Sequence, residues 1–249
     1  MNLHDRYLQQ ASWTRDLRTY LFAHAKWRSA RRLLEVGCGT GAILRDLELA
    51  SAGRKPGSAA LFGLDNARVP LRECRRHAGR VHLAQADALA LPFPDQAFDI
   101  TYCHFLLLWV DDPVAALREM RRVTSGHVLA LAEPDYSHRV DTPSEFIELG
   151  RLQTETLHQQ GADVSLGSRL ARLFEHAGLQ IRETGVIEPW DGRSDSASHL
   201  QAEWDMLEAD VGHLLSAEEL QRYRQLDADA RKRNIRQLYV PTYFAWGQV

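Results

Sequence analysis

The chain has 249 residues, of which 45% are hydrophobic and 25% charged, and its formal net charge is −3. This composition is typical of a globular protein and suffices for one domain with a substantial core. The slight negative charge argues against a general binder of nucleic acid or anionic membranes, and no apolar run approaches the length of about 20 residues that spans a bilayer.

Residues 5 to 28 carry apolar side chains at helical spacing, which predicts one or two helices before the first strand. An apolar strand near 32–36 leads into three alternate glycines, Gly37, Gly39 and Gly41, and then into a helical pattern. Glycine permits a sharp turn and close approach of a ligand, and a helix start offers unpaired N–H groups and partial positive charge to an anion. The segment therefore predicts a site for a nucleotide-type cofactor.

Further apolar runs alternate with helical segments and predict strands near residues 59–64, 81–84, 97–103 and 127–133. This alternation predicts an α/β fold with a doubly wound parallel sheet, in which ligand groups gather at the carboxyl ends of the strands. Asp65 ends the second strand, Asp87 the third, and Cys103 and His104 the fourth. We therefore expect these residues along one edge of one sheet.

Two cofactor classes compete for the glycine turn. Gly37 to Ala42 fits G-x-G-x-x-G/A, the dinucleotide fingerprint, and Glu35 to Gly41 equally fits E-x-G-x-G-x-G. Asp65 serves either class, because both bind two ribose hydroxyls; its alternative role is to cap the helix beginning at Asn66. Asp87 separates them, since a carboxylate there can read the exocyclic amine of S-adenosylmethionine (SAM), whereas a dehydrogenase has no standard need for it.

The segment Leu91 to Asp99 has the pattern L-P-F-P-D-x-x-F-D directly after the strand that ends at Asp87. With the glycine motif and the two acids, it resembles class I SAM-dependent methyltransferases of the quinone-biosynthesis type (methyltransferase type 11) over roughly residues 31–135. The resemblance implies a Rossmann-like seven-stranded sheet with an antiparallel hairpin of the last two strands at its edge. It also implies SAM as methyl donor and S-adenosylhomocysteine as product.

The resemblance also implies a set of cofactor-binding residues. They are Trp13, Arg15, Glu35, Gly37, Cys38, Gly39, Gly41, Asp65, Asn66, Asp87, Ala88, Cys103 and His104. The glycine turn would hold the amino acid end of SAM, and Glu35 would either hold its ammonium group or merely brace the turn. Asp65 would bind the ribose. Asp87 and Ala88 would meet the adenine, unless Asp87 serves only an Asx turn.

Related enzymes fold an N-terminal helix over the cofactor. Trp13 could pack on SAM there and Arg15 could pair with its carboxylate, although ordinary packing and a solvated arginine explain them equally well. His104 lies where the family places residues beside the transferable methyl group, so it is the candidate general base; a hydrogen-bonded wall residue is the alternative. Alignment in a dry pocket is expected to supply most of the acceleration.

The second half of the chain predicts helices at 144–160 and 168–176, a strand at 179–187, a helical insert at 195–236 and a closing strand at 238–247 that contains Pro241. Within one domain of residues 1–249, segments 1–30, 137–165 and 195–236 would form a cap, and Glu133 to Tyr136 would line its mouth. The cap is rich in apolar and aromatic residues, namely Tyr7, Trp13, Phe146, Leu149, Trp190, Trp204, Met206 and Tyr243. Unless many of these form helix core instead, they favour a small acceptor that is partly apolar or aromatic.

Some alternatives stay open. A nicotinamide-dependent oxidoreductase, or a SAM-binding protein without turnover, would carry a similar glycine turn. The basic cluster Arg231 to Arg236 could suggest RNA binding, but a solvated helix face explains it better, so we expect no nucleic-acid partner. The three cysteines lack metal-ligand spacing and cannot all pair, and the first residues lack a leader pattern, so we expect no metal site and a cytoplasmic location.

Overall fold

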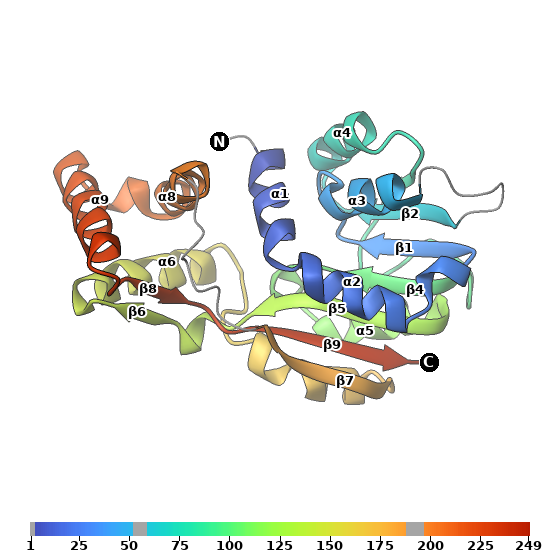
Figure 1. Ribbon diagram of the computed structural model, residues 1–249. Helices are drawn as coiled ribbons and strands as arrows, with labels where there is room; N and C mark the ends of the chain where they lie inside the picture. The colour runs from blue at the N-terminus through green and yellow to red at the C-terminus, as the bar shows by residue number, and fades with distance from the viewer. Residues whose placement is uncertain (1–2, 52–58, 188–196) are drawn as a thin grey trace.

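A seven-stranded sheet in the order β3-β2-β1-β4-β5-β9-β7 forms the centre of the computed structural model, which describes residues 3–51, 59–187 and 197–249 (Figure 1). The strands are β1 (Arg32–Val36), β2 (Ala60–Asp65), β3 (His82–Gln85), β4 (Phe98–Cys103), β5 (Thr124–Pro134), β7 (Gln180–Ile187) and β9 (Thr242–Gln248). The first five are mutually parallel, and β9 runs antiparallel between β5 and β7. The predicted doubly wound α/β fold with an antiparallel edge is confirmed.

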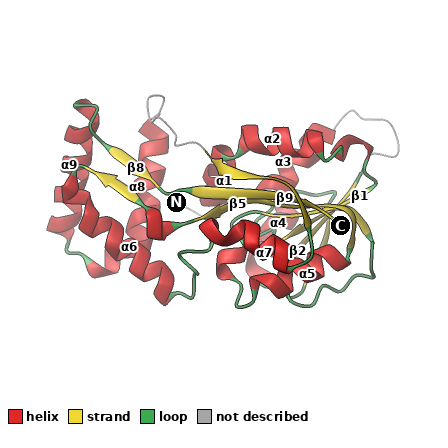
Figure 2. Cartoon of the chain, turned by 90° about the horizontal axis from the view of Figure 1, so that it is seen from below, coloured by secondary structure: helices red, strands yellow, loops and turns green. Residues whose placement is uncertain are grey.

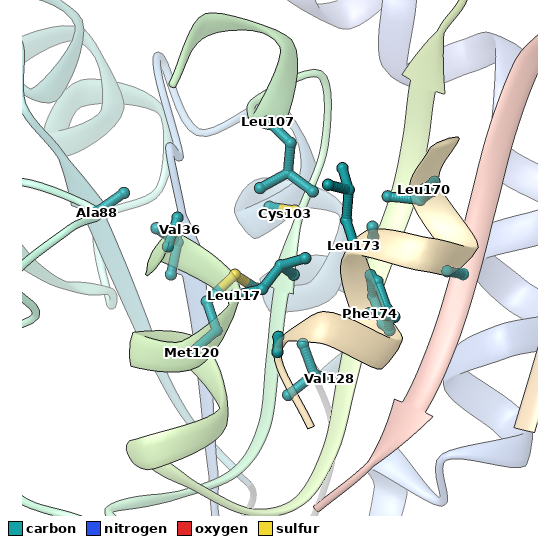
Figure 3. Close-up of a cluster of buried hydrophobic side chains, with 14 of the residues drawn as sticks. Val36, Ala88, Cys103, Leu107, Leu117, Met120, Val128, Leu170, Leu173 and Phe174 are labelled. Carbon is teal, nitrogen blue, oxygen red and sulfur yellow. The ribbon is translucent and has the colours of Figure 1, made fainter. Parts of the chain in front are cut away.

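Helices cover both faces of this sheet (Figure 2). One face carries α2 (Arg15–His24), α3 (Ala42–Ser51) and α4 (Arg68–His77), and the other carries α5 (Pro113–Arg122) and α7 (Leu170–His176). Adjacent residues of the central strand β1 point to opposite faces of the sheet. Leu33 packs on the face of α2, α3 and α4, and Leu34 packs on the face of α5 and α7. Figure 3 shows the second face, where Met120 of α5 and Phe174 of α7 meet Val128 of β5. Burial on both sides explains the continuous apolar runs of the sequence.

Two helices of this core carry common capping residues at their ends. Asp112 caps α5 by accepting a hydrogen bond from Ala115 N at 2.9 Å, with Pro113 in the first turn. Gly178 follows α7 with φ of 77°, the left-handed conformation that closes many helices. The predicted N-terminal helical region is two helices, α1 (Leu3–Trp13) and α2.

A second lobe lies beside the carboxyl edge of the sheet, and α1 stands between this lobe and α3 (Figure 1). It contains α6 (Ile147–Gln159), α8 (Ala197–Val211), α9 (Ala217–Lys232) and a small sheet of β6 (Val140–Thr142) with β8 (Gln237–Tyr239). The prediction of one closing strand at 238–247 is wrong. Pro241 divides it into β8 and β9, because proline has no N–H for a ladder; its carbonyl instead accepts from Asp135 N at 2.8 Å.

The second lobe has its own core, which contains three of the eight residues expected to line a pocket. Phe146, Leu149 and Trp204 are at most 8% exposed and pack together there. Trp190 lies outside the described residues. The basic cluster is also partly internal: Arg236 Nε donates to Asp227 Oδ1 at 2.9 Å, and both side chains are 7% exposed. The interpretation of this cluster as a solvated face is therefore wrong for Arg236.

Candidate functional site

A cavity of about 520 Å³ opens at the carboxyl edge of the sheet, within the size range of small-molecule sites. Its walls come from the ends of β1, β2, β3 and β4, from α1 above them, and from the C-terminal end of α6 in the second lobe. The predicted residues that line it are Glu35, Gly37, Cys38, Gly39, Asp65, Asn66, Asp87, Ala88 and His104. Strand register therefore brings together groups that are far apart in the sequence.

The turn between β1 and α3 requires glycine for two reasons. Gly37 and Gly39 have φ of 73° and 50°, a region that residues with a side chain rarely adopt. A Cβ on Gly37 would also lie 2.6 Å from Leu106 Cδ1, and one on Gly39 would lie 2.5 Å from Tyr7 Cε2. The turn is thus a close-fitting cradle in front of the N-terminus of α3, where an anionic group is favoured.

Asp65 connects the glycine turn to the second strand. Its Oδ2 accepts from Gly39 N at 2.8 Å and its Oδ1 accepts from Ala67 N at 2.8 Å. The second bond is an Asx turn before α4, which begins at Arg68 and not at Asn66. Each carboxylate oxygen keeps a further lone pair and Asp65 lines the cavity, so the residue can brace the turn and still accept from ribose hydroxyls.

Asp87 lies at the exposed end of β3. Its Oδ1 accepts from Leu89 N at 2.9 Å, which is the Asx turn anticipated as the alternative to cofactor binding. The described residues provide no partner for Oδ2, and Ala88 beside it lines the cavity. An adenine amine therefore fits Oδ2, and the turn and the cofactor role are compatible.

Glu35 is 3% exposed beneath the glycine turn. Its Oε2 accepts from the Tyr102 hydroxyl at 3.2 Å, and burial raises the pKa of its carboxyl well above the ordinary value. The glycine turn itself is held by the Leu64 carbonyl, which accepts from Gly37 N at 2.7 Å and Cys38 N at 2.9 Å. No described residue bonds Oε1, so a cationic ammonium group would complete the environment of this carboxylate.

His104 is tied to the N-terminal helices. Its Nε2 lies 3.0 Å from Thr14 Oγ1, which accepts from Arg18 Nη1 at 2.8 Å, and Arg18 Nη2 donates to Asp46 Oδ2 at 2.7 Å. Burial, with the Arg18 cation adding to it, lowers the pKa of His104 to about 3. The imidazole is therefore neutral near pH 7 and a weak base, which favours the wall residue over the general base.

Glu133 is fully buried and does not line the mouth of the cavity, contrary to prediction. Its Oε1 accepts from Leu106 N at 3.1 Å and Leu107 N at 3.0 Å, and its Oε2 from Leu108 N at 3.3 Å. These bonds hold the 3-10 turn Leu107–Trp109, which forms part of the cavity wall. Burial raises the pKa of Glu133 to about 7. Of the predicted segment, only Tyr136 reaches the cavity.

Helix α1 covers the cavity as expected, but with a different face. Trp13 and Arg15 are exposed, and neither they nor the buried Gly41 and Cys103 are among the described residues that line the cavity. The helix instead contributes Leu3, Arg6, Tyr7, Gln10 and Ala11. Their spacing of three and four residues places them on one face of the helix. This spacing is visible in the sequence, and it places Trp13 on another side of the helix.

The described residues contain no group of three or more side chains placed to hold a metal ion. None of the helices in that part of the chain is long and apolar enough to cross a membrane.

Comparison with known proteins places the chain among methyltransferases. Residues 34–130 match the family described as a methyltransferase domain. A malonyl-acyl-carrier-protein O-methyltransferase from Halorhodospira halophila is 30% identical over 69% of this chain and 54% of its own length. A demethylmenaquinone methyltransferase from Staphylococcus haemolyticus is 30% identical over 59% of this chain and 68% of its own length. The chain spans about half the length of several of these curated relatives.

Solved structures share the fold at low sequence identity. The 4+2 cyclase SpnF has a TM-score of 0.58 and 20% identity over 94% of this chain and 79% of its own. A putative methyltransferase from Bacillus halodurans has a TM-score of 0.57 and 15% identity, covering 92% of this chain and 97% of its own. The names attached to these two similar folds differ, so the fold alone does not assign a reaction.

Proposed function

Because the chain belongs to the class I family of SAM-dependent methyltransferases, we propose that it transfers a methyl group from SAM to a small-molecule acceptor. The observation that carries the proposal is the convergence on one cavity of the glycine cradle, Asp65, Asp87 and the unpaired Oε1 of Glu35. These groups match the three parts of SAM. Glu35 would hold the ammonium group, Asp65 the ribose, and Asp87 with Ala88 the adenine.

Bound SAM supplies an electrophilic methyl group on a sulfonium, which is already a good leaving group. The acceptor atom forms its bond to the methyl carbon as the carbon–sulfur bond breaks, and the electron pair of that bond stays on sulfur in S-adenosylhomocysteine. The task of the protein is then to align the acceptor and exclude water. Tyr7 and Leu106, which lie against the glycine turn, would provide that exclusion.

The acceptor half of the cavity would have several apolar or aromatic wall residues. Leu108, Trp109, Tyr136 and Leu157 line it on the side of the second lobe. They support an acceptor with an apolar or aromatic part. The weak basicity of His104 supports an acceptor that needs no strong base, so that its proton, where it has one, leaves to solvent. Relatives named as O-methyltransferase and as quinone C-methyltransferase do not single out the acceptor atom.

Equilibrium binding tests the donor first. SAM and S-adenosylhomocysteine should bind the whole chain tightly in calorimetry, and NAD should not; tight NAD binding without SAM binding would overturn the proposal. Transfer of an isotope-labelled methyl group from SAM to a broad panel of small carboxylates, phenols, quinols and amines then tests turnover. SAM binding with no transfer across the whole panel would favour a SAM-binding protein without turnover.

A further inference from the structure

Arg6 is the one arginine or lysine among the described residues that line the cavity. The carboxylates of that lining, apart from Asp111 at the exposed rim, are Glu35, Asp65 and Asp87, and these are assigned to the cofactor. A cation inside a ligand cavity is costly to desolvate unless something neutralises it. The group that neutralises the charge of Arg6 therefore indicates which charge the second ligand carries.

Arg6 is only weakly neutralised by the protein. Its Nη2 lies 3.5 Å from Asp210 Oδ1 of α8, at the outer limit of a hydrogen bond, and its side chain is 27% exposed. Asp210 is itself held elsewhere, because its Oδ2 accepts from Gln153 Nε2 at 2.7 Å. A guanidinium carries five N–H donors, so most donors of Arg6 have no partner among the described residues.

The buried arginines of the second lobe provide the contrast. Arg139 donates to Asp141 and Gln153, and Arg236 donates to Asp141, Asp227 and two backbone carbonyls. Both side chains are 7% exposed. The second lobe thus provides hydrogen-bond partners for the guanidinium groups of these two structural arginines. Arg6, in contrast, has N–H donors at the cavity without a partner among the described residues.

Helix α1 separates the two halves of the cavity, and its neighbouring side chains point to different halves. Tyr7 lies against Gly39, on the side of α3 and the glycine turn. Arg6 reaches Asp210 of α8, on the side of the second lobe, and α1 stands between these two sides (Figure 1). Arg6 also acts electrostatically on two phenols of the cavity wall, that of its neighbour Tyr7 and that of Tyr136. Arg6 therefore faces the acceptor half.

We propose that Arg6 forms an anion subsite in the acceptor half, so that the acceptor carries a carboxylate or phosphate group beside an apolar part. This inference rests on the proposed function, because it assigns the other half of the cavity to SAM. The guanidinium fork binds such oxyanions in a two-point geometry, and Tyr136 and Gln160 of the same cavity lining offer further donors. The apolar part would lie along Leu108 and Leu157.

Two other roles for Arg6 give different results in experiment. A purely structural ion pair between α1 and α8 would make Arg6 and Asp210 equally important and would leave ligand charge without effect. A partner for the carboxylate of SAM would show as a loss of cofactor affinity. An acceptor subsite instead predicts charge-selective binding of a second ligand while the cofactor half is filled.

The test uses the full chain saturated with S-adenosylhomocysteine and compares octanoate with octanamide, which has a neutral head of similar shape. Octyl phosphate distinguishes a phosphate site from a carboxylate site. Dissociation constants are measured by calorimetry for the wild type, Arg6→Gln and Asp210→Asn. Arg15→Gln is the matched control, since it removes an exposed arginine near the same helix but outside the cavity.

We expect the wild type and Arg15→Gln to bind octanoate or octyl phosphate at least about tenfold more tightly than octanamide, the effect of one charged hydrogen bond or more. Arg6→Gln should lose this preference while keeping its affinity for S-adenosylhomocysteine. Asp210→Asn should keep or strengthen the preference, because it removes a competing carboxylate.

Three results would overturn the inference: no charge preference in the wild type, equal losses in Arg6→Gln and Asp210→Asn, or a loss of cofactor affinity in Arg6→Gln with unchanged octanoate binding. Failure of the wild type to bind S-adenosylhomocysteine would instead contradict the proposed function, so the two failures are distinguishable.

Discussion

Replacing Glu133 with glutamine should remove a pH dependence that the stability of the wild-type protein shows between about pH 4.5 and 7. Burial raises the pKa of this carboxyl from its ordinary 4.5 to about 7 in the folded protein. Between these values the unfolded chain has released the proton and the folded chain still binds it, so stability is highest at the low end and falls as pH rises. The difference corresponds to about 3 kcal/mol, at 1.36 kcal/mol for each tenfold change in proton affinity.

Glutamine is the suitable replacement because it resembles the protonated acid. Its carbonyl oxygen can keep the bonds from Leu106 N and Leu107 N, and its amide nitrogen sacrifices only the longer bond from Leu108 N. Urea unfolding of both proteins at a series of pH values from 4.5 to 8 measures the effect, and all other titrating groups cancel in the difference. The free energy of unfolding of the wild type should fall by about 3 kcal/mol relative to Glu133→Gln and then level off. A difference that stays constant or rises with pH would refute the burial argument.

Three further predictions concern the cofactor cradle and its wall. Asp87→Ala should weaken SAM binding more than tenfold in calorimetry, and Asp87→Asn, which keeps an acceptor for Leu89 N, should weaken it too; unchanged affinity in both would mean that the adenine is read elsewhere. Gly39→Ala should weaken SAM binding about tenfold or more and lower the melting temperature, because its Cβ would lie 2.5 Å from the Tyr7 ring; a partial rescue by Tyr7→Ala would identify the clash as the cause, and wild-type behaviour of the single variant would count against it. The imidazole proton signals of His104 should not shift between pH 5 and 8 in NMR, since its pKa is about 3; a titration near pH 6.5 that disappears in His104→Asn would contradict this.

The parts of the site that follow the sheet could be predicted from local patterns. Gly37 and Gly39 report a backbone conformation that few other residues tolerate, and Asp65 and Asp87 end strands whose carboxyl ends must meet in a parallel sheet. The turn hydrogen bonds that Asp65 and Asp87 accept, beside the cofactor contacts proposed for them, could not be read in this way. Only the coordinates show that one oxygen of Asp87 braces a turn while the other stays available.

Helix α1 shows where local patterns were insufficient. The sequence predicted a helix over the cofactor, but the choice between the face of Tyr7 and the side of Trp13 depends on where the helix lies relative to the glycine turn and the second lobe. Glu133 is a similar case, because a carboxylate at a strand end can face the cavity or turn inward to cap a buried turn. The burial of the Glu133 carboxyl against three backbone N–H donors depends on the three-dimensional structure, and the spacing of residues in the sequence does not reveal it.

The sequence by itself predicted the methyl donor, through its resemblance to a family, and the edge of the sheet where we expect the donor to bind, because glycine conformation and strand direction are local properties. Tertiary structure decided the acceptor side. Pro241 divides the last strand between two sheets, the aromatic residues of the insert bury one another, and Arg6 alone brings a positive charge to the described cavity wall. Two of these outcomes depend on contacts between residues more than 100 positions apart, Asp135 with Pro241 and Arg6 with Asp210, and such contacts leave no periodic trace in the chain.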